Sequence, residues 1–239
     1  MTKPNDIIGD SKAIITNQEG IHEKLDEVVE KHLSHAFQKP YQAHTKQAFA
    51  QMNALVVEFL AKNPKGDVIL DACCGVGQST RILAEQNPNA LVIGVDKSAH
   101  RIERNVEGFS DQAGYQATNY HLVRADLNDF YRLVKAANWP VSKHYILYPN
   151  PWPKSKHLQR RWHGSAVFPH MTSIGNVLIL RSNWLLYLEE FKQAAQYVNL
   201  QGKITLVPSN DNHVALTPFE AKYQASDQHC WQLMLKAKE

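Results

Sequence analysis

Short apolar runs alternate with amphipathic stretches along most of the chain. The runs are rich in Val, Ile and Leu, which is typical of strands buried on both faces. The stretches between them carry apolar residues at three- and four-residue steps, as amphipathic helices do. This alternation predicts an α/β fold with a doubly wound, mainly parallel sheet. The predicted helices are 45–62, 78–86, 128–137 and 185–198. The predicted strands are 68–72, 91–95, 120–124, 144–148, 176–181, 203–207 and 229–235, the last an antiparallel insert.

The first predicted helix, 45–62, follows a polar segment. Thr45 is a suitable N-cap, and Asn63-Pro-Lys-Gly66 ends the helix. We expect this helix to cover the sheet and to carry no chemistry. Residues 1–44 are polar and locally acidic, so we expect a loosely ordered, partly helical N-terminal arm that is not the main contact for a polyanion. Residues 45–239 are expected to form a single domain. The apolar stripe of the helix consists of Phe49, Met52, Leu55, Val56, Phe59 and Leu60.

Composition excludes several classes of protein. The chain has 239 residues, 44% of them hydrophobic, but no run of about 18 apolar residues that would cross a membrane. Its first residues lack the apolar core of a signal peptide. Three cysteines, two of them adjacent, give neither a disulfide framework nor a metal spacing, and His32 and His35 have no further ligand at a fixed distance. We therefore expect a cytoplasmic protein without membrane segment or metal, either monomer or homodimer.

A glycine turn connects the first predicted strand to the helix that follows it. The turn reads Cys73-Cys-Gly-Val-Gly77, with Asp71 just before it, and the next strand ends on Asp96. Such glycines let a ligand approach the backbone and the N–H groups that open the helix. An acidic residue at the tip of the second strand can accept from both ribose hydroxyls. Position 79 is Ser and position 80, where the motif has its third glycine, is Thr, so the full dinucleotide motif is absent, and no Gly-Lys-Ser/Thr follows, which excludes a P-loop.

Asp71 distinguishes between the ligands that such a turn can bind. A carboxylate at this position attracts a cationic ligand and repels a pyrophosphate. S-adenosylmethionine carries cationic amino and sulfonium groups, so it fits better than a nicotinamide dinucleotide. Downstream, Asp126 at the tip of the third strand can accept the adenine amino group, and Leu127 can pack on the adenine ring. The alternative for Asp71 is a structural cap at the strand end.

The loop after the strand at 144–148 combines prolines with aromatic and basic residues. Pro149, Pro151 and Pro153 exclude helix and ladder pairing, because each lacks an N–H and fixes φ. The loop is therefore stiff and leaves the carboxyl end of a strand, where open α/β sheets bind ligands. It presents an amide, an indole and several cations in succession, which are Asn150, Trp152, Lys154, Lys156, His157, Arg160 and Arg161.

Positive charge is concentrated around this loop. The net charge of the chain is only +3, but no Asp or Glu occurs in residues 130–188. A local patch of this kind attracts phosphates through counterion release, and an aromatic ring beside cations suits a nucleotide. The pattern predicts RNA as the partner, and the alternative is a surface turn with solvated charges. The basic residues of the span are Arg132, Lys135, Lys143, Lys154, Lys156, Arg160, Arg161 and Arg181.

These motifs together resemble the bacterial tRNA (guanine-N7)-methyltransferase family, from about residue 66 to the carboxyl terminus. The proline–tryptophan–lysine loop and a distal Thr-x-Phe-Glu are specific to that family, whereas the glycine turn is common to S-adenosylmethionine (SAM) methyltransferases. The resemblance implies a Rossmann-like class I methyltransferase fold, with a mainly parallel seven-stranded sheet and an antiparallel C-terminal strand. It rests on Asp71, Gly75-Val-Gly77, Asp96, Asp126, Pro149-Asn-Pro-Trp-Pro-Lys154, His157, Arg160-Arg161, Ser182-Asn-Trp184 and Thr217-Pro-Phe-Glu220.

The resemblance also implies ligands and residue roles. SAM is the implied methyl donor, S-adenosylhomocysteine the product and tRNA the partner. The implied cofactor-binding residues are Asp71, Cys73, Gly75, Gly77, Asp96, Lys97, Asp126, Leu127 and Asn150. The implied substrate-binding residues are Trp152, Lys154, Lys156, Arg160, Arg161, Asn183, Thr217, Phe219 and Glu220, and the catalytic positions are Asn150 and Asn183.

Asn150 and Asn183 stand where the family has aspartates. Guanine N7 has a lone pair, so its methylation needs alignment and electrostatics rather than a base. A carboxylate accepts from both N1–H and the amino group of guanine, whereas an amide offers one acceptor and one donor. A charge at about 4 Å is nominally worth about 4 kcal/mol at an effective dielectric of 20. Losing two charges therefore lowers the rate strongly or changes the accepted base, and Glu220 is the remaining acidic candidate.

Three functions stay open at this point. The first is tRNA guanine-N7 methylation in which Asn150 and Asn183 still orient the base. The second is a SAM-binding, RNA-binding homologue with a changed substrate or without turnover. The third is methylation of an exocyclic amine, because an Asn-Pro-aromatic loop at a strand end resembles the amino-methyltransferase pattern. It ranks third because the order here is Asn-Pro-Trp-Pro.

Overall fold

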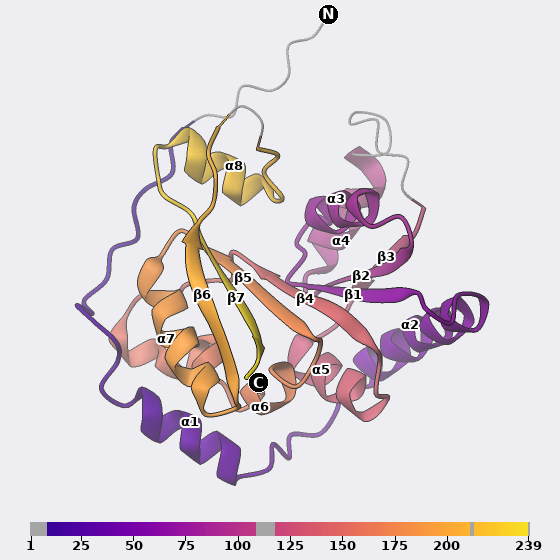
Figure 1. Ribbon diagram of the computed structural model, residues 1–239, viewed down its shortest axis with the longest axis horizontal. Helices are drawn as coiled ribbons and strands as arrows, with labels where there is room; N and C mark the ends of the chain where they lie inside the picture. The colour runs from indigo at the N-terminus through magenta and orange to yellow at the C-terminus, as the bar shows by residue number, and fades with distance from the viewer. Residues whose placement is uncertain (1–8, 109–117, 211–212, 239) are drawn as a thin grey trace, which may run out of the picture.

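The computed structural model describes residues 9–108, 118–210 and 213–238, which contain one sheet of order β3-β2-β1-β4-β5-β7-β6 (Figure 1). Strands β1 to β5 pair in parallel, and β7 lies antiparallel between β5 and β6. This confirms the predicted mainly parallel, seven-stranded sheet and its antiparallel C-terminal strand. The strands are β1 (Asp67–Ala72), β2 (Ala90–Asp96), β3 (Tyr120–Arg124), β4 (Val141–Leu147), β5 (Val177–Ser182), β6 (Leu200–Leu206) and β7 (Trp231–Ala237).

Helices cover both faces of the sheet. On one face α3 and α4 pack against β2 and β3; on the other, α2 and α5 pack together, and α6 and α1 continue this layer toward α7 (Figure 1). Within the described residues, no helix has both the length and the apolar character needed to cross a membrane. The helices are α1 (Leu25–Ser34), α2 (Ala43–Lys62), α3 (Gln78–Gln86), α4 (Ala99–Gly108), α5 (Leu127–Ala136), α6 (Phe168–Met171), α7 (Leu185–Gln196) and α8 (Pro218–Ala225), with 3-10 turns η1 (Ser155–Arg160) and η2 (Trp162–Gly164).

Helix α2 begins earlier than its sequence predicts, and Thr45 is not its N-cap. Gln42 occupies the cap position. The Thr45 side chain is buried, and its hydroxyl accepts the backbone N–H of Asp126 at 3.1 Å. A tertiary partner at the start of α5 thus replaces the local cap. The predicted apolar stripe does pack on α5, because Phe49 lies edge-on to Phe130 with ring centroids 5.5 Å apart.

The N-terminal arm lies along the surface of the domain. Its described part runs as an extended segment from residue 9 past α8 and the loop after β4, and then forms α1 (indigo in Figure 1). Helix α1 buries Leu25, Val28 and Val29 and contacts α6 and α7. The polar composition of the arm gave no indication of these contacts, since each is made with residues distant in sequence.

The strand order reverses between β1 and β4. These two parallel strands are neighbours, and Asp71 lies opposite Tyr145 in their register. At such a reversal the outgoing loops diverge to opposite faces of the sheet, and the carboxyl edge where they part, called the crevice below, is the usual ligand site of an open α/β sheet. The glycine turn follows β1 and the proline-rich loop follows β4, so the fold brings the two predicted sites together.

Candidate active site

The turn after β1 has a backbone that only particular residues adopt easily. Cys73, Gly75 and Gly77 have φ values of 62°, 60° and 77°, in the left-handed region. A Cβ on Gly77 would lie 2.4 Å from a methyl of Leu122, so this position also needs glycine for space. Helix α3 begins directly afterwards at Gln78. Its first N–H groups therefore open toward the crevice.

Asp71 is a buried carboxylate at the end of β1. Its Oδ2 accepts hydrogen bonds from the hydroxyls of Ser79 at 2.6 Å and Thr80 at 2.7 Å. Its Oδ1 is also buried, and among the described residues it has no hydrogen-bond partner. Burial raises the pKa of Asp71 to about 6, against the two hydroxyl hydrogen bonds, which lower it. A buried acceptor without a partner is costly, so the site favours a ligand that brings a donor or a positive charge.

Asp96 joins the tip of β2 to the glycine turn. Its two carboxylate oxygens accept the backbone N–H groups of Gly75 at 3.1 Å and Ser98 at 2.8 Å. Arg101 lies 3.5 Å from the same carboxylate. Lys97, the next residue, is exposed. Asp96 therefore fixes the turn and remains at the crevice edge.

Asp126 and Leu127 stand beyond the tip of β3. Asp126 is the N-cap of α5, and its Oδ1 accepts from the backbone N–H of Asn128 at 2.8 Å. Its Oδ2 accepts from the Gln42 side chain at 3.0 Å, and Leu127 is buried. Because β3, β2 and β1 are consecutive in the sheet, Asp126, Asp96 and Asp71 come to the same edge, as the sequence predicts.

Cys73 also lies in this turn, but its chemistry is that of a neutral thiol. Burial, with the carboxylates of Asp96 and Asp71, raises the pKa of the Cys73 thiol to about 12. A protonated thiol is a weak nucleophile and a poor metal ligand. No group of three or more potential metal ligands occurs within the parts of the chain that the structure describes.

The loop after β4 presents an aromatic ring between cations. Trp152 adopts φ 46°, and its backbone N–H donates to Asn150 Oδ1 at 3.4 Å. The Arg160 guanidinium lies over the Trp152 ring, 4.8 Å from the centroid. His157 meets the edge of the same ring at 5.5 Å. The exposed residues of this surface include Asn150, Lys154, Lys156 and Arg160.

Arg161 lies in the interior, in contrast to the prediction that it contacts substrate. Its side chain is 0% exposed and pairs with Glu190. The same guanidinium donates to the carbonyl oxygens of Trp152 at 3.2 Å and Lys154 at 3.4 Å. Arg161 therefore holds the loop from inside while Arg160 faces solvent. The side chains of these two neighbouring arginines point in different directions, one to solvent and one to the interior, although the sequence alone does not distinguish them.

The sequence reasoning missed Glu190, the partner of Arg161. It is 0% exposed on α7 and also accepts from His163 at 2.8 Å and from the backbone N–H of His22 at 3.0 Å. Burial acts to raise the pKa of Glu190, but His163 and Arg161 together lower it to about 2. A signal exists in the sequence, because Glu190 falls on the face of α7 that carries Tyr187, Phe191 and Ala194. An acidic residue on the apolar face of a helix is buried, and a buried acid is expected to pair with a basic residue.

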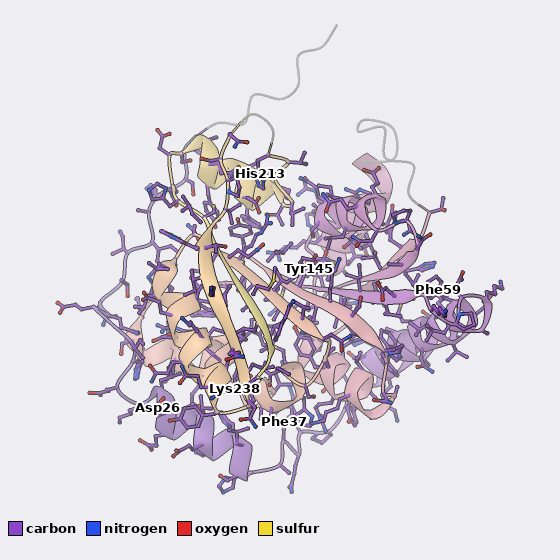
Figure 2. All side chains as sticks on the ribbon, viewed as in Figure 1. Asp26, Phe37, Phe59, Tyr145, His213 and Lys238 are labelled. Carbon is purple, nitrogen blue, oxygen red and sulfur yellow. The ribbon has the colours of Figure 1, made fainter. Side chains whose placement is uncertain are left out.

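Glu220 is buried as well, and its oxygens are engaged. They accept from Arg181 at 2.9 and 3.0 Å, from His213 at 2.7 Å and from the Tyr148 hydroxyl at 2.9 Å. His213 precedes α8 in the sequence and is labelled in Figure 2. Thr217 caps α8 by accepting the backbone N–H of Glu220 at 3.0 Å. Glu220, which was predicted to contact a base, thus links the end of β4, β5 and α8 through its hydrogen bonds.

Phe219 and Asn183 are two further residues predicted to contact the substrate. Phe219 is 48% exposed and stacks on Tyr223 with centroids 6.3 Å apart. Asn183 is half-buried after β5, and its amide donates to Gln228 Oε1 at 3.0 Å. An aromatic face is therefore open to solvent, whereas the Asn183 amide already has a partner.

The chain resembles known proteins in sequence. Residues 65–233 match the family model described as "Putative methyltransferase". The chain is 26% identical over 179 residues to the tRNA (guanine-N(7)-)-methyltransferase of Shewanella oneidensis, covering 72% of this chain and 73% of that protein. It is 27% identical over 180 residues to the protein of that name from Shewanella putrefaciens, with the same coverage.

Solved methyltransferases share the fold. One is a mutant of the 16S rRNA (adenine(1408)-N(1))-methyltransferase with cosubstrate SAM from Catenulisporales acidiphilia, with a TM-score of 0.53, 16% identity, and coverage of 77% of this chain and 92% of that one. Another is the aminoglycoside resistance methyltransferase NpmB1, with a TM-score of 0.53, 16% identity, and coverage of 77% and 93%. These likenesses confirm the predicted class I methyltransferase fold. Because the family model spans well over half of the chain, the chain belongs to this methyltransferase family.

Proposed function

We propose that this protein transfers a methyl group from SAM to RNA, and that its target is N7 of a guanine in tRNA. The observation that carries the first part is Asp71 Oδ1, a buried carboxylate oxygen without a partner among the described residues, beside the glycine turn. The relatives named tRNA (guanine-N(7)-)-methyltransferase support the second part.

The residues at the carboxyl edge fit SAM. When bound, SAM supplies an electrophilic methyl group on a sulfonium. Asp71 would bind its cationic amino end, since a charge satisfies the buried carboxylate better than a neutral donor does. Asp96 would accept from the ribose hydroxyls, and the turn of Gly75 and Gly77 would let the backbone approach the ligand. Asp126 and Leu127 would bind the adenine through its amino group and its face.

The surface after β4 fits RNA. Lys154, Lys156 and Arg160 are exposed, and no acidic residue occurs between 130 and 188. The cations would bind phosphates, and Trp152 with Arg160 on its face offers a platform for a base. Because β4 adjoins β1, this surface begins next to the cofactor residues.

Transfer to N7 needs no proton removal, since N7 has a lone pair in the plane of the base. The residues of the chain must therefore align the base and exclude water. Asn150 is exposed at the start of the loop, and Asn183 lies after the neighbouring strand β5. Their amides would orient the base by hydrogen bonds without the charge of a carboxylate, which favours a modest rate.

The test is incubation of the protein with labelled SAM and unmodified tRNA, followed by mass spectrometry of the nucleosides. We expect 7-methylguanosine, and none of it with the Asp71→Asn variant. A tRNA that already carries 7-methylguanosine serves as the control substrate and should accept no further label. Absence of any methylated nucleoside at saturating SAM would contradict the proposal.

A homologue with a changed substrate is the second candidate. The observation that favours it is the engagement of Glu220 by Arg181, His213 and Tyr148, so that both oxygens of this carboxylate already accept hydrogen bonds and are not free for the guanine edge. Asn183 is likewise bonded to Gln228. Label in a methylated nucleoside other than 7-methylguanosine would support this candidate. Binding of SAM and tRNA without any transfer would support loss of turnover.

A further inference from the structure

A groove of about 460 Å³ lies between the N-terminal arm and the loop after β4. The residues that line it are Ile15, Thr16, Asn17, Lys154 and Lys156. Ile15 is 86% exposed, although it is a large apolar residue, and both lysines are exposed. None of the lining residues is acidic. The groove therefore combines an apolar wall with two positive charges, and its volume lies in the range of small-ligand sites.

Hydrogen bonds fix the two walls of the groove to each other. The Thr16 hydroxyl donates to the Pro153 carbonyl at 2.6 Å. The backbone N–H of Ser155 donates to Asn17 Oδ1 at 3.0 Å. Gln18 continues this attachment in the interior, where its side-chain oxygen accepts from Arg161 at 3.0 Å. Because the walls are held together before any ligand arrives, the groove is preorganised.

We propose that this groove binds one nucleotide of the RNA substrate, close to the nucleotide that is methylated. Lys154 and Lys156 would bind its phosphate, and Ile15 would pack against its base or ribose. The proposal rests on the proposed function, because Lys154 and Lys156 belong to the surface that would bind RNA. Charge complementarity argues for a nucleotide here, since an apolar surface beside two lysines, with no acid among the lining residues, matches a ring attached to a phosphate.

The proposal gives the N-terminal arm a part in substrate binding. Four acidic residues of the arm lie in α1 or just before it, at Glu23, Asp26, Glu27 and Glu30. Asp10 and Glu19 lie on either side of the segment 15–17 in the sequence, but this segment, which lines the groove, is itself uncharged. An arm that is locally acidic can therefore still contribute one neutral wall to a basic site. Its average charge does not decide where RNA contacts it.

The first test is the affinity of the full chain for unmodified tRNA, measured by fluorescence anisotropy. Ile15→Asp places a negative charge in the groove, and we expect affinity to fall about fivefold, as for like charges about 4 Å apart in water. The matched control is Val57→Asp, which adds the same charge at a position 60% exposed on α2. Its tRNA affinity should equal that of the unaltered chain, and SAM affinity by calorimetry should be unchanged in both variants.

The second test is photocrosslinking with benzoylphenylalanine at position 15 or 57. We expect a crosslink to tRNA from position 15 alone, and competition by unlabelled tRNA should remove it. If the unaltered chain binds tRNA, Lys154→Ala weakens this binding, and position 15 affects neither affinity nor crosslinking, the groove proposal is overturned and the proposed function stands. If the unaltered chain binds no tRNA, both are overturned.

Discussion

Arg161 and Glu190 form an ion pair at 2.5 Å from which solvent is excluded, with both side chains 0% exposed. The pair joins α7 to the loop after β4, because Arg161 also donates to the carbonyl oxygen of Trp152. A buried charge without its partner destabilises a fold strongly. The conformation that presents Trp152 and the exposed cations therefore depends on an interaction beneath the surface.

Arg161→Ala tests this dependence. We expect the free energy of unfolding to fall by about 3–5 kcal/mol, because Glu190 then remains buried without its permanent positive partner. Urea unfolding at pH 7.5 measures the change. The matched control is Arg160→Ala, since Arg160 is exposed and contacts the Trp152 ring only from outside. It should change stability by about 0.5 kcal/mol or less while weakening tRNA binding. Equal stability of the two variants would contradict a structural role for Arg161.

Asp71→Asn should weaken SAM binding and stabilise the unliganded protein. The pKa of Asp71 is raised to about 6 by burial, above its ordinary value of 3.8. The ionised carboxylate therefore costs stability; the cost is absent below about pH 4, grows as the pH rises from about 4 to about 6, and is constant above that, where the carboxyl is ionised in both states. At pH 8 the substitution should raise the free energy of unfolding by up to about 3 kcal/mol. Urea unfolding measures the stability and calorimetry the SAM affinity.

Asp67 provides the control for Asp71, because it begins the same strand and is exposed. Asp67→Asn should leave both the free energy of unfolding at pH 8 and the affinity for SAM unchanged. If Asp71→Asn binds SAM as tightly as the unaltered protein does, Asp71 is only a structural cap at the strand end.

SAM affinity should depend on pH through the same carboxyl. Binding a cation requires ionised Asp71, so a proton competes with the ligand below the pKa of about 6. We expect affinity to be constant from pH 7 to about 6.5 and to fall toward tenfold per pH unit below about pH 5.5. Calorimetry in two buffers of different ionisation enthalpy should show proton release at pH 5.5. Constant affinity between pH 5 and 7 would exclude this coupling.

Lys154→Ala should reduce the salt dependence of tRNA binding. Each phosphate contact releases counterions, so the slope of log affinity against log salt should decrease in magnitude by about 1. Lys62→Ala is the control, because it removes the same charge from α2, where Lys62 pairs with Glu58. An identical slope for Lys154→Ala and the unaltered chain would exclude Lys154 from the contact with phosphate.

Asn150→Asp should raise guanine-N7 methylation if the reaction is merely weakened by the loss of charge. A carboxylate accepts from both donors of the guanine edge, which the amide cannot do. Because Asn150 is exposed, solvent screens the added charge, and we expect a gain of about tenfold rather than the several decades nominal for two buried charges. Borohydride–aniline cleavage at 7-methylguanine measures the product. No gain would indicate that a different base is the substrate.

The placement of the strand-tip carboxylates was predictable from the sequence. Asp71, Asp96 and Asp126 each follow an apolar run, and parallel strands bring such residues to one edge whatever else the chain does. The boundaries of β3 and α3 agree with the predicted ranges, because the pattern of apolar residues that predicts them lies within each element. Thr45 shows the limit of local signals, because its hydroxyl accepts from Asp126 instead of capping its own helix.

The sequence by itself determined the order of the strands, the helices α2, α3, α5 and α7, the carboxylates at the strand tips and the basic composition of the loop, but not α4, α6 and α8. These follow from apolar spacing, proline geometry and the absence of acids, all of which are local properties of the chain. Only the tertiary structure decided that Arg160 faces solvent while Arg161 pairs with Glu190, and that Glu220 is engaged by Arg181. It also brought the arm to Lys154. The physical reason is that a partner distant in sequence determines whether a charged side chain is buried or exposed. The local pattern of apolar and polar residues does not identify that partner.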